Sequence, residues 1–342
     1  MDYNDKVMGF SKHSLANSLN DKEFQLIFFP TEQCNFRCTY CYEDFELGKM
    51  PDWLINASKT LIKNKIKSLD KLTLSWFGGE PLLAKSIIIE IAEYAIQLGK
   101  KYNCKISGDL TTNGSLLSIK TLERLVALKQ NFFQISIDGD KIFHDQTRLT
   151  RNGTGSFDKI WHRLIEASKT DLDFKIMLRV HITDFNQNSV LNFCEKYERE
   201  LANDSRFKLY FKAIENLGGD NIEKISKLIS KRSARQFSEL LTDRYKKSVK
   251  RNENGHYICY ASKANSLIIR ANGELNKCTV ALSDERNRLG KINSDGTLSI
   301  NNHKYSSWLK GFTTLDSWQM GCPLGYMNNH SNVGDIQVKK VS

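Results

Sequence analysis

Three cysteines lie close together near the N-terminus with a spacing suited to cluster ligation. Cys34, Cys38 and Cys41 fall within eight residues, and Tyr40 directly precedes the last of them. Thiolates are the usual protein ligands of iron–sulfur clusters. A cubane cluster has four irons, so three thiolates leave one iron that can bind a substrate or a cofactor. The spacing therefore indicates a site for chemistry rather than a simple electron carrier.

A zinc site and a disulfide framework are the alternatives for these thiols. Structural zinc takes four nitrogen or sulfur ligands, usually supplied as paired CxxC or CxxH units. The next candidate ligands along the chain are as distant as Cys104 and His144. Disulfide frameworks are typical of small secreted domains, whereas this chain has 8 cysteines in 342 residues. Both alternatives explain the spacing less well than a cluster does.

Between residues 24 and 214, strand-like apolar runs alternate with helical patterns. This alternation predicts a parallel sheet that closes partly into a barrel. Six strands are expected, at 24–29, 72–77, a run ending at 112, 132–137, 174–183 and 209–214. Polar loops follow the first four of them: the cysteine loop and the segments 78–81, 111–114 and 136–139. Because the loops after parallel barrel strands converge at one rim, we expect these four to meet there.

Two features of the sequence can bind charged groups. Gly78 and Gly79 leave the backbone bare, so that its carbonyls can approach an ammonium group, and Glu80 adds a carboxylate acceptor. An ordinary turn at the start of a helix is compatible with the same residues. Further along, the planar guanidinium of Arg148 can bond both oxygens of a carboxylate. On sequence alone Arg148 could equally form a surface ion pair.

The CxxxCxxC spacing with Tyr40, together with Gly78-Gly-Glu-Pro81, resembles the signature of the radical S-adenosylmethionine (SAM) enzymes. The resemblance extends from about residue 24 to residue 327. It implies an α/β fold with a partial (β/α)6 TIM-like barrel and a [4Fe-4S] cluster whose open iron binds SAM. The cluster ligands would be Cys34, Cys38 and Cys41, and the cofactor-binding residues would be Tyr40, Gly78, Gly79, Glu80, Ser136 and Arg148. The implied chemistry is cleavage of SAM to a 5′-deoxyadenosyl radical that takes a hydrogen atom from the substrate.

The last quarter of the chain contains a second group of cysteines. Cys259 is followed by thirteen residues, a glycine, four residues and Cys278, and segment 266–278 predicts two strands joined by an Asn-Gly turn. This arrangement resembles the opening of SPASM and twitch domains, which carry auxiliary clusters. Only Cys322 follows, too few thiolates for two clusters. We therefore expect one auxiliary [4Fe-4S] cluster on Cys259, Cys278 and Cys322, its fourth site open, filled by substrate or taken by a residue such as His330.

Unrelated buried thiols are the alternative for this second group. Packing is the expected role of Cys104 and Cys194. Four segments are therefore predicted: an N-terminal extension (1–23), the barrel (24–220), a basic bridging helix (221–258) and an α+β auxiliary-cluster domain (259–342).

The formal net charge of +11 is concentrated in the bridging segment, where ten Lys or Arg residues between 224 and 251 oppose only Glu239 and Asp243. Its apolar residues recur at helical spacing, so a basic amphipathic helix is predicted. The basic face is either simply solvated or a docking surface for an acidic peptide. The chain begins without a signal-peptide core and has no membrane-length apolar run, so a cytoplasmic location is expected.

Within the family, the resemblance is nearest to enzymes that modify peptides. Sulfatase maturases carry a catalytic Asp directly after the cysteine that matches Cys278, and Thr279 stands there, although Asp284 is near. The expected function is maturation of a ribosomally made precursor peptide by a crosslink, either a carbon–carbon cyclophane or a thioether. The expected partners are this peptide and an electron donor such as flavodoxin or ferredoxin, without nucleic acid or membrane.

Two alternatives stay open, namely a twitch-type dehydrogenase or epimerase acting on a small molecule, and sulfatase-maturase-like oxidation. A nucleic-acid-binding protein would need aromatic residues interleaved along the basic helix, which the sequence lacks. The 23 residues before the barrel are too short for a leader-binding domain of the winged-helix type, and the sequence leaves the oligomeric state open.

Overall fold

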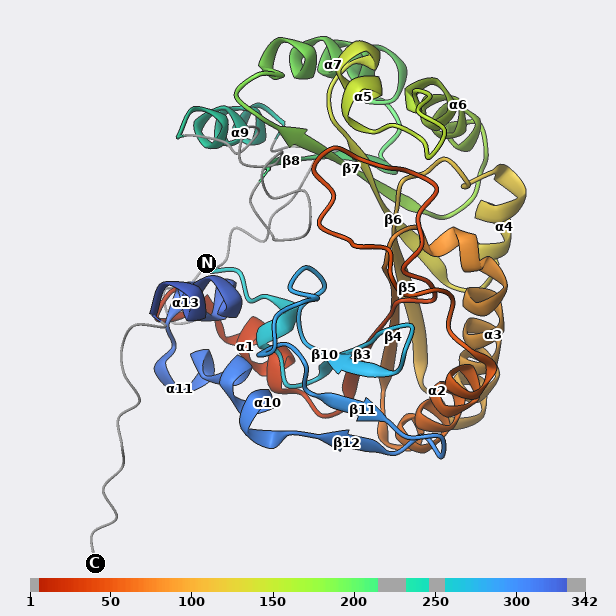
Figure 1. The fold of residues 1–342 in the computed structure, drawn as a ribbon, viewed down its shortest axis with the longest axis vertical. Helices are drawn as coiled ribbons and strands as arrows, with labels where there is room; N and C mark the ends of the chain where they lie inside the picture. The colour runs from red at the N-terminus through yellow and green to blue at the C-terminus, as the bar shows by residue number, and fades with distance from the viewer. Residues whose placement is uncertain (1–5, 215–231, 246–255, 331–342) are drawn as a thin grey trace, which may run out of the picture.

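The computed structural model describes residues 6–214, 232–245 and 256–330. Its centre is a curved sheet of ten strands in the order β12-β11-β10-β9-β3-β4-β5-β6-β7-β8 (Figure 1). The strands from β3 to β8 are all parallel, and each pairs with the next along the chain. Their bounds are β3 Glu23–Phe28, β4 Lys71–Trp76, β5 Lys105–Thr112, β6 Gln130–Ile137, β7 Lys175–Ile182 and β8 Phe207–Ala213.

Helices cover the convex side of this sheet (Figure 1). Side chains at alternate strand positions, such as Leu26, Leu74 and Leu178, join the helices in one large apolar core, as the pleat of a strand requires. The predicted α/β fold with six strand–helix repeats is confirmed. The helices of this part are α2 Asp52–Lys65, η2 Ile66–Ser68, η3 Pro81–Ala84, α3 Lys85–Tyr102, α4 Ile119–Ala127, α5 Lys141–Thr147, α6 Phe157–Ser168, α7 Gln187–Glu200 and α9 Arg232–Arg244.

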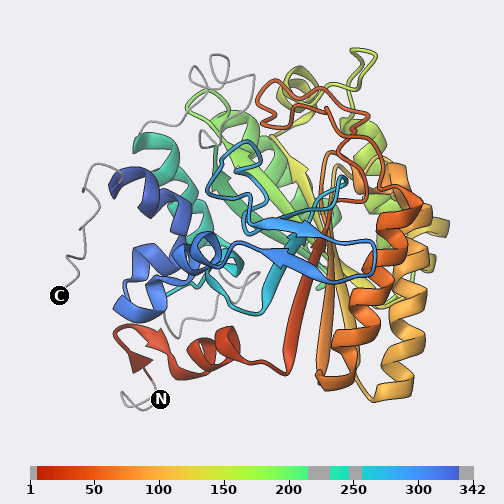
Figure 2. The ribbon, with the colours of Figure 1, turned by 60° about the horizontal axis from the view of Figure 1, so that its bottom comes forward.

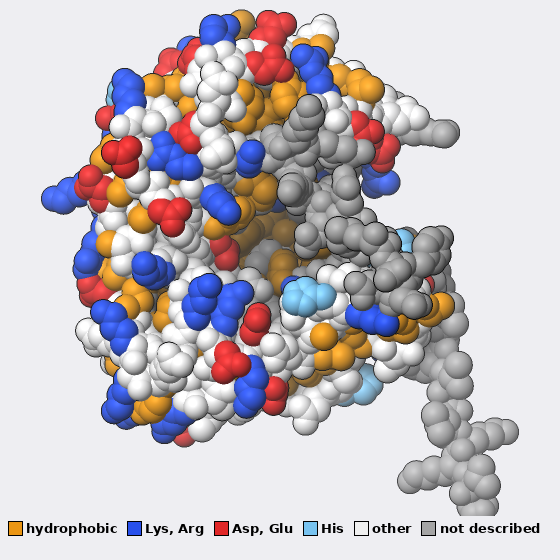
Figure 3. Space-filling model, turned by 180° about the vertical axis from the view of Figure 1, so that it is seen from behind, with side chains coloured by type: hydrophobic (Ala, Val, Ile, Leu, Met, Phe, Trp, Pro, Cys, Tyr) orange, Lys and Arg blue, Asp and Glu red, His pale blue; other side chains and the backbone are white. Residues whose placement is uncertain are grey.

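The opposite, concave side of the sheet is polar in its first half. The Gln25 amide donates to the Ser75 hydroxyl (2.9 Å), which donates to Asp109 Oδ2 (2.7 Å), so hydrogen bonds cross three strands. Nearer the C-terminal ends of the strands, Ile27 packs with Ile268 in a second, smaller apolar cluster. Seen from the back of Figure 1, this part of the molecule is hollowed, with hydrophobic side chains inside the hollow (Figure 3).

The C-terminal region continues the same sheet. Strand β9 (Ser266–Ile269) pairs in parallel with β3, and β10 (Glu274–Asn276), β11 (Gly290–Ile292) and β12 (Leu298–Ile300) follow in antiparallel order. The predicted Asn-Gly turn between β9 and β10 is confirmed, with Gly273 at φ +85°. Short helices complete the region: η4 Tyr260–Ser262, α10 Asn302–Leu309, α11 Gly311–Thr314, α12 Ser317–Gly321 and α13 Pro323–His330.

The segment before the barrel folds against this C-terminal region. It forms a two-stranded hairpin, β1 (Lys6–Val7) and β2 (Phe10–Ser11), followed by helix α1 (Lys12–Leu19). Phe10 packs with Ile258 and Met320, and α1 lies beside the C-terminal helices in both views (Figures 1 and 2). The sequence offered no assignment for these elements, because their apolar partners lie more than two hundred residues away.

Only part of the predicted basic bridging helix can be assessed. Helix α9 lies inside it, whereas residues 221–231 and 246–255 are outside the described residues. Along α9, Arg244 forms an ion pair with Glu198 of α7 (3.4 Å). In the described part of the chain, no helix combines the length and the apolarity needed to cross a membrane. The division into four segments stays a prediction.

A buried ion pair joins the cysteine loop to the C-terminal hairpin. Arg270, directly after β9, donates from Nη2 to Glu32 Oε2 (2.7 Å) and from Nε to Glu32 Oε1 (3.1 Å). Neither side chain is more than 8% exposed. Glu274 adds a second carboxylate 3.3 Å from Nη1. A charged pair this deep needs its full set of hydrogen bonds to offset the loss of hydration.

Replacing Arg270 by Ala is expected to destabilise the protein by about 3–5 kcal/mol, because Glu32 would be left as an uncompensated buried charge. The free energy of unfolding is measured by urea denaturation under anaerobic conditions. Arg288→Ala serves as the control, since Arg288 pairs with Glu274 and Glu285 while 45% exposed and should cost less than about 1 kcal/mol. Equal effects of the two substitutions would contradict this account of the ion pair.

Candidate active site at the mouth of the barrel

The cysteine loop, between β3 and α2, rests directly on Gly78 and Gly79. A Cβ atom on Gly78, which has φ +108°, would collide with the carbonyl oxygen of Thr31. One on Gly79 would lie 2.7 Å from the carbonyl oxygen of Gln33. Glycine is therefore required at both positions for the close approach of two backbones. The sequence predicted that the backbone of Gly78 and Gly79 is open to close contact. In the structure, the backbone of the cysteine loop makes that contact.

Glu80 is fully buried beneath this contact. Its carboxylate accepts hydrogen bonds from the backbone N–H of Asn113 (2.7 Å) and Leu82 (3.0 Å) and from the Thr112 hydroxyl (2.8 Å). Burial raises the pKa of Glu80, and these hydrogen bonds oppose the rise. Glu80 thus fastens the 78–81 loop to the end of β5. A direct bond from Glu80 to the amino group of SAM stays a prediction.

On its other side, the cysteine loop runs antiparallel to residues 147–151. The backbone N–H of Arg37 donates to the Leu149 carbonyl (2.8 Å), that of Thr39 to Thr147 (3.0 Å) and that of Arg151 to the Asn35 carbonyl (2.7 Å). Arg148 lies in the middle of this pairing. Two segments more than a hundred residues apart therefore place the predicted carboxylate-binding arginine beside the predicted cluster ligands.

A buried polar network holds Tyr40 in place. Its hydroxyl donates to Asp138 (2.7 Å) and accepts from Arg148 Nη1 (2.8 Å), while His181 Nδ1 lies 3.0 Å from Asp138 Oδ1. Burial lowers the pKa of His181 to about 4. Burial would raise the pKa of Asp138, but the His181 hydrogen bond and the Arg148 charge outweigh it and hold that pKa well below its usual range. Because His181 is neutral at pH 7, Arg148 is the cation that balances Asp138.

The site has unsatisfied groups that suit the absent cofactors. The Nε atom of Arg148 is buried without a hydrogen-bond partner, and Arg148 lies near enough to Cys38 to influence its pKa. A carboxylate placed there would satisfy the orphan donor. Ser136 faces the concave side of β6, is half-buried, and makes no side-chain hydrogen bond within the described residues. These observations fit the predicted roles of Ser136 and Arg148, which stay predictions.

The three thiols themselves lie within electrostatic range of one another. Burial raises the pKa of Cys34 to about 12 and that of Cys41 further, and iron bound to the sulfur would reverse this by stabilising the thiolate. Among the described residues, no three His, Cys, Asp or Glu side chains converge on a single ion. The assignment of Cys34, Cys38 and Cys41 as ligands stays a prediction.

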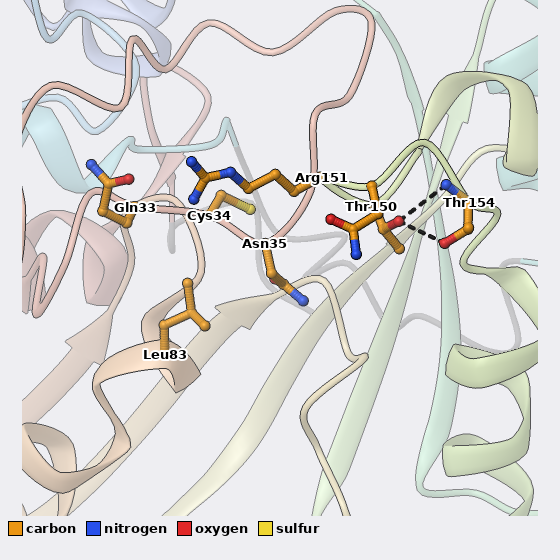
Figure 4. Close-up of a pocket in the computed structure, with 8 residues that line it drawn as sticks. Gln33, Cys34, Asn35, Leu83, Thr150, Arg151 and Thr154 are labelled. Atoms are coloured by element: carbon orange, nitrogen blue, oxygen red, sulfur yellow. Dashed lines mark hydrogen bonds between the residues drawn. The ribbon is translucent and has the colours of Figure 1, made fainter.

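A pocket of 490 Å³ lies between the cysteine loop and residues 150–154. Figure 4 shows the Arg151 side chain lying along Cys34, with Leu83 of η3 below them. The pocket is lined by Gln33, Cys34, Asn35, Leu83, Thr150, Arg151, Asn152 and Thr154. One predicted cluster ligand, Cys34, therefore lines this pocket.

The second group of cysteines is also brought together. Cys259 and Cys322 each influence the pKa of Cys278, and Cys322 that of Cys259, which requires that the three lie near one another. Burial raises the pKa of Cys278 to about 12. The backbone of Cys259 donates to the Met320 carbonyl (2.9 Å), so α12 holds Cys259 near Cys322. The auxiliary cluster stays a prediction, and the side chain of His330 is outside the described residues.

Asn287 organises the loop around Cys278. Its Oδ1 accepts from the backbone N–H of Lys277 and Cys278, both at 2.9 Å, and its Nδ2 donates to the Cys278 and Ala281 carbonyls. Sequence reasoning missed this residue, as it missed Asp138 and His181. A lone Asn in a loop carries no distinctive signal, whereas the Asp of the Ser-Ile-Asp-Gly loop at the barrel rim could have been singled out.

A parallel barrel sheet with three thiols on the loop after its first strand, and an arginine with a free donor beside them, defines a radical SAM type of site. Residues 28–196 match the model of the Radical SAM superfamily, and the chain belongs to this superfamily. Membership implies a [4Fe-4S] cluster and SAM. The chain is 27% identical over 198 residues to a cysteine-type anaerobic sulfatase-maturating enzyme of Clostridium novyi, covering 54% of this chain and 50% of that protein. It therefore spans about half the length of that relative.

Other relatives match over longer stretches. A GTP 3′,8-cyclase of Aliarcobacter butzleri is 28% identical, with 62% of this chain and 64% of that protein covered. Among solved structures, anSMEcpe with bound AdoMet and the Cp18Cys peptide gives a TM-score of 0.62 at 19% identity, covering 88% of both chains. Streptococcus suis SuiB bound to its precursor peptide SuiA gives 0.56 at 14% identity, covering 87% and 69%. At these identities the structural matches establish the fold.

Changing Cys34, Cys38 and Cys41 together to Ala is expected to remove about four irons per chain and to abolish reductive cleavage of SAM, with the C-terminal iron retained. Iron content and 5′-deoxyadenosine are measured after anaerobic reconstitution. The matched control is Cys104→Ala with Cys194→Ala, two buried thiols away from the site, which should leave both readouts intact. Cleavage of SAM by the triple variant would refute the ligand assignment.

The Asp138 network predicts a pH dependence of stability. His181 has a pKa of about 4 in the folded state and about 6.5 when unfolded, so the unfolded state binds more protons between these values. Stability due to neutral His181 is complete above pH 6.5 and is lost as the pH falls towards 4, by about 2 kcal/mol between pH 7 and 5. In His181→Asn, urea denaturation of the iron-free protein should show a correspondingly smaller loss. An unchanged pH slope would mean that His181 is already charged when folded.

Proposed function

We propose that the protein is a radical SAM maturase that takes a hydrogen atom from a residue of a ribosomally made precursor peptide and forms a carbon–carbon or thioether crosslink. The observation that carries this proposal is the placement of both cysteine groups on adjoining strands. The cysteine loop follows β3, and Cys259 precedes β9, which pairs with β3 in parallel. The Glu32–Arg270 ion pair fixes the two regions together.

Formation of a crosslink is an oxidation, so it needs an electron acceptor. The second group of cysteines could provide one. SAM bound at the barrel mouth would supply the oxidant that removes one hydrogen atom from the peptide, and a proton and an electron must leave as the new bond closes. The proton passes to water or a basic side chain, and an auxiliary cluster at Cys259, Cys278 and Cys322 is the proposed acceptor of the electron. A fixed sheet connection keeps that acceptor at a constant distance from the barrel.

The residues of this chain are proposed to bind and orient the cofactor and the substrate. Tyr40 is held by Asp138 and Arg148 at the barrel mouth, and Arg148 keeps one donor free for a carboxylate. The concave face, closed on one side by the C-terminal hairpins, excludes water from the reacting residue. A flavodoxin or ferredoxin is the proposed electron donor. A peptide as substrate is supported by the fold shared with SuiB and anSMEcpe, whose structures hold peptides.

Sulfatase-maturase-like oxidation is the second candidate, favoured by the similarity to the Clostridium novyi enzyme. The residues after Cys278 disfavour sulfatase-maturase-like oxidation. Thr279 follows that cysteine, with its hydroxyl bonded to Tyr260 (2.7 Å). Asp284 forms an ion pair with Arg286 at 2.6 Å, so it is not a spare carboxylate directed at a substrate.

Coexpression with a small peptide encoded beside the gene is expected to yield a product lighter by two hydrogens per modified site, and tandem mass spectrometry should locate the new bond. The control is the triple Cys34, Cys38 and Cys41 to Ala variant, which should leave the peptide unchanged. An unchanged mass with an inverted α-carbon would indicate epimerisation instead. Oxidation of a synthetic sulfatase peptide would favour the second candidate, and turnover of a small molecule alone would overturn peptide maturation.

A further inference from the structure

Arg179 lies on the concave face of β7, and its side chain has no hydrogen-bond or ion-pair partner in the part of the chain that the structure describes. Its neighbours along the strand, Leu178 and Val180, are buried in the helix-covered core, so the Arg179 side chain projects to the opposite side. In register it stands between Ser136 of β6 and Tyr210 of β8. It is also near enough to His181 and to Tyr42 of the cysteine loop to influence their pKa values. Arg179 thus faces the interior of the barrel below the predicted cofactor site.

The guanidinium of Arg179 has donors that no acceptor among the described residues satisfies. Its Nε is buried without a hydrogen-bond partner, and within the described residues its side chain makes no hydrogen bond or ion pair. By contrast, Arg206 donates to Asp204 and to three backbone carbonyls, and Arg270 is satisfied by Glu32. Buried donors in native proteins are nearly always paired. An unpaired arginine facing the barrel interior therefore indicates an acceptor that arrives with a ligand.

The surroundings favour an anionic acceptor. Lys208 and Lys212 alternate with the buried residues of β8, so they lie on the same concave face as Arg179. Asp138, a carboxylate at this rim, is already bonded to Tyr40 and His181, and Glu43 of the cysteine loop forms no ion pair with Arg179 among the described residues. The other half of the barrel, from β3 to β5, presents the neutral Gln25–Ser75 ladder and Asp109. The β7–β8 side of the interior therefore carries basic side chains, and the β3–β5 side carries neutral hydrogen-bonded groups and the Asp109 carboxylate.

We propose that Arg179 binds a carboxylate of the peptide substrate, an Asp or Glu side chain or the C-terminal carboxylate, and so fixes which residue meets the radical. This rests on the function proposed above. The planar fork of an arginine can bond both oxygens of a carboxylate, which sets direction as well as affinity. The methionyl carboxylate of SAM is the other source of the same chemistry. Arg148 is better placed to bind the SAM carboxylate. The residues on either side of it are hydrogen-bonded to the backbone of the cysteine loop, and its Nε has no hydrogen-bond partner within the described residues.

The test is a double-mutant cycle on the reconstituted, SAM-loaded protein. The probe is the labelled precursor peptide encoded beside the gene, with each Asp or Glu changed singly to Asn or Gln and the C-terminus amidated in one version. Arg179→Gln should weaken binding at least about tenfold. One of the altered peptides should lose as much affinity for the unaltered protein, and the two changes together should cost no more than either alone.

Lys175→Ala is the matched control, because Lys175 is on the same face of β7 but exposed at its other end, and it should leave the affinity unchanged. Arg179→Lys keeps the charge without the fork and should weaken binding by an intermediate amount. SAM affinity, measured separately, should be the same in all variants. Loss of SAM affinity in Arg179→Gln would assign the residue to the cofactor, and additive losses in the cycle would show that no peptide carboxylate meets Arg179. Either result overturns the inference while leaving peptide maturation by the unaltered protein intact; a peptide that this protein never modifies would defeat both proposals.

Discussion

The buried pair of Glu32 and Arg270 is the interaction on which the arrangement of the two cysteine groups depends. Glu32 stands two residues before Cys34, and Arg270 begins the turn that leads to Cys278, so one contact sets the position of both groups. Removing two charges from water is costly unless their hydrogen bonds are complete. Arg270 meets this condition with bonds to Glu32, Glu274 and the Leu282 carbonyl. Sliding of β9 against β3 would break the two hydrogen bonds from Arg270 to Glu32 and leave Glu32 as a buried charge without its cation, so this geometry resists displacement.

The cysteine loop is an irregular segment that gains its shape from its neighbours. The two glycines of the 78–81 loop support it from below, residues 147–151 pair with it along one side, and the Asn113 amide reaches Asn35 (2.8 Å) from the end of β5. These contacts do not require metal, because they join backbone and side-chain groups of the chain itself. These contacts restrict the loop independently of the thiols, which lowers the entropy lost when a cluster orders the three thiols.

The sequence was sufficient for the elements and for the chemistry, because both rest on local patterns. Alternating apolar residues identified β3 to β8 within a residue or two at most ends, and the cysteine spacing identified the family. What it could not supply were contacts between distant segments. Glu80 is predicted to bind the cofactor, and the sequence did not reveal that Thr112 and Asn113, some thirty residues away, hold its carboxylate. The Asp138–His181 contact and the packing of Phe10 on Met320 were missed for the same reason.

The two walls of the barrel interior differ in a way that bears on selectivity. The β3–β5 wall satisfies its own polar groups through side-chain hydrogen bonds, so it can accept a substrate of almost any polarity without a specific partner. The β7–β8 wall leaves Arg179 unsatisfied, so a substrate that lacks an acceptor there would bury the orphan donor more completely and bind less well. Discrimination of this kind is strong, because rejection follows from the unmet hydrogen bond and not from shape alone. The position of a carboxylate relative to the reacting carbon would then determine which residue of a flexible peptide is modified.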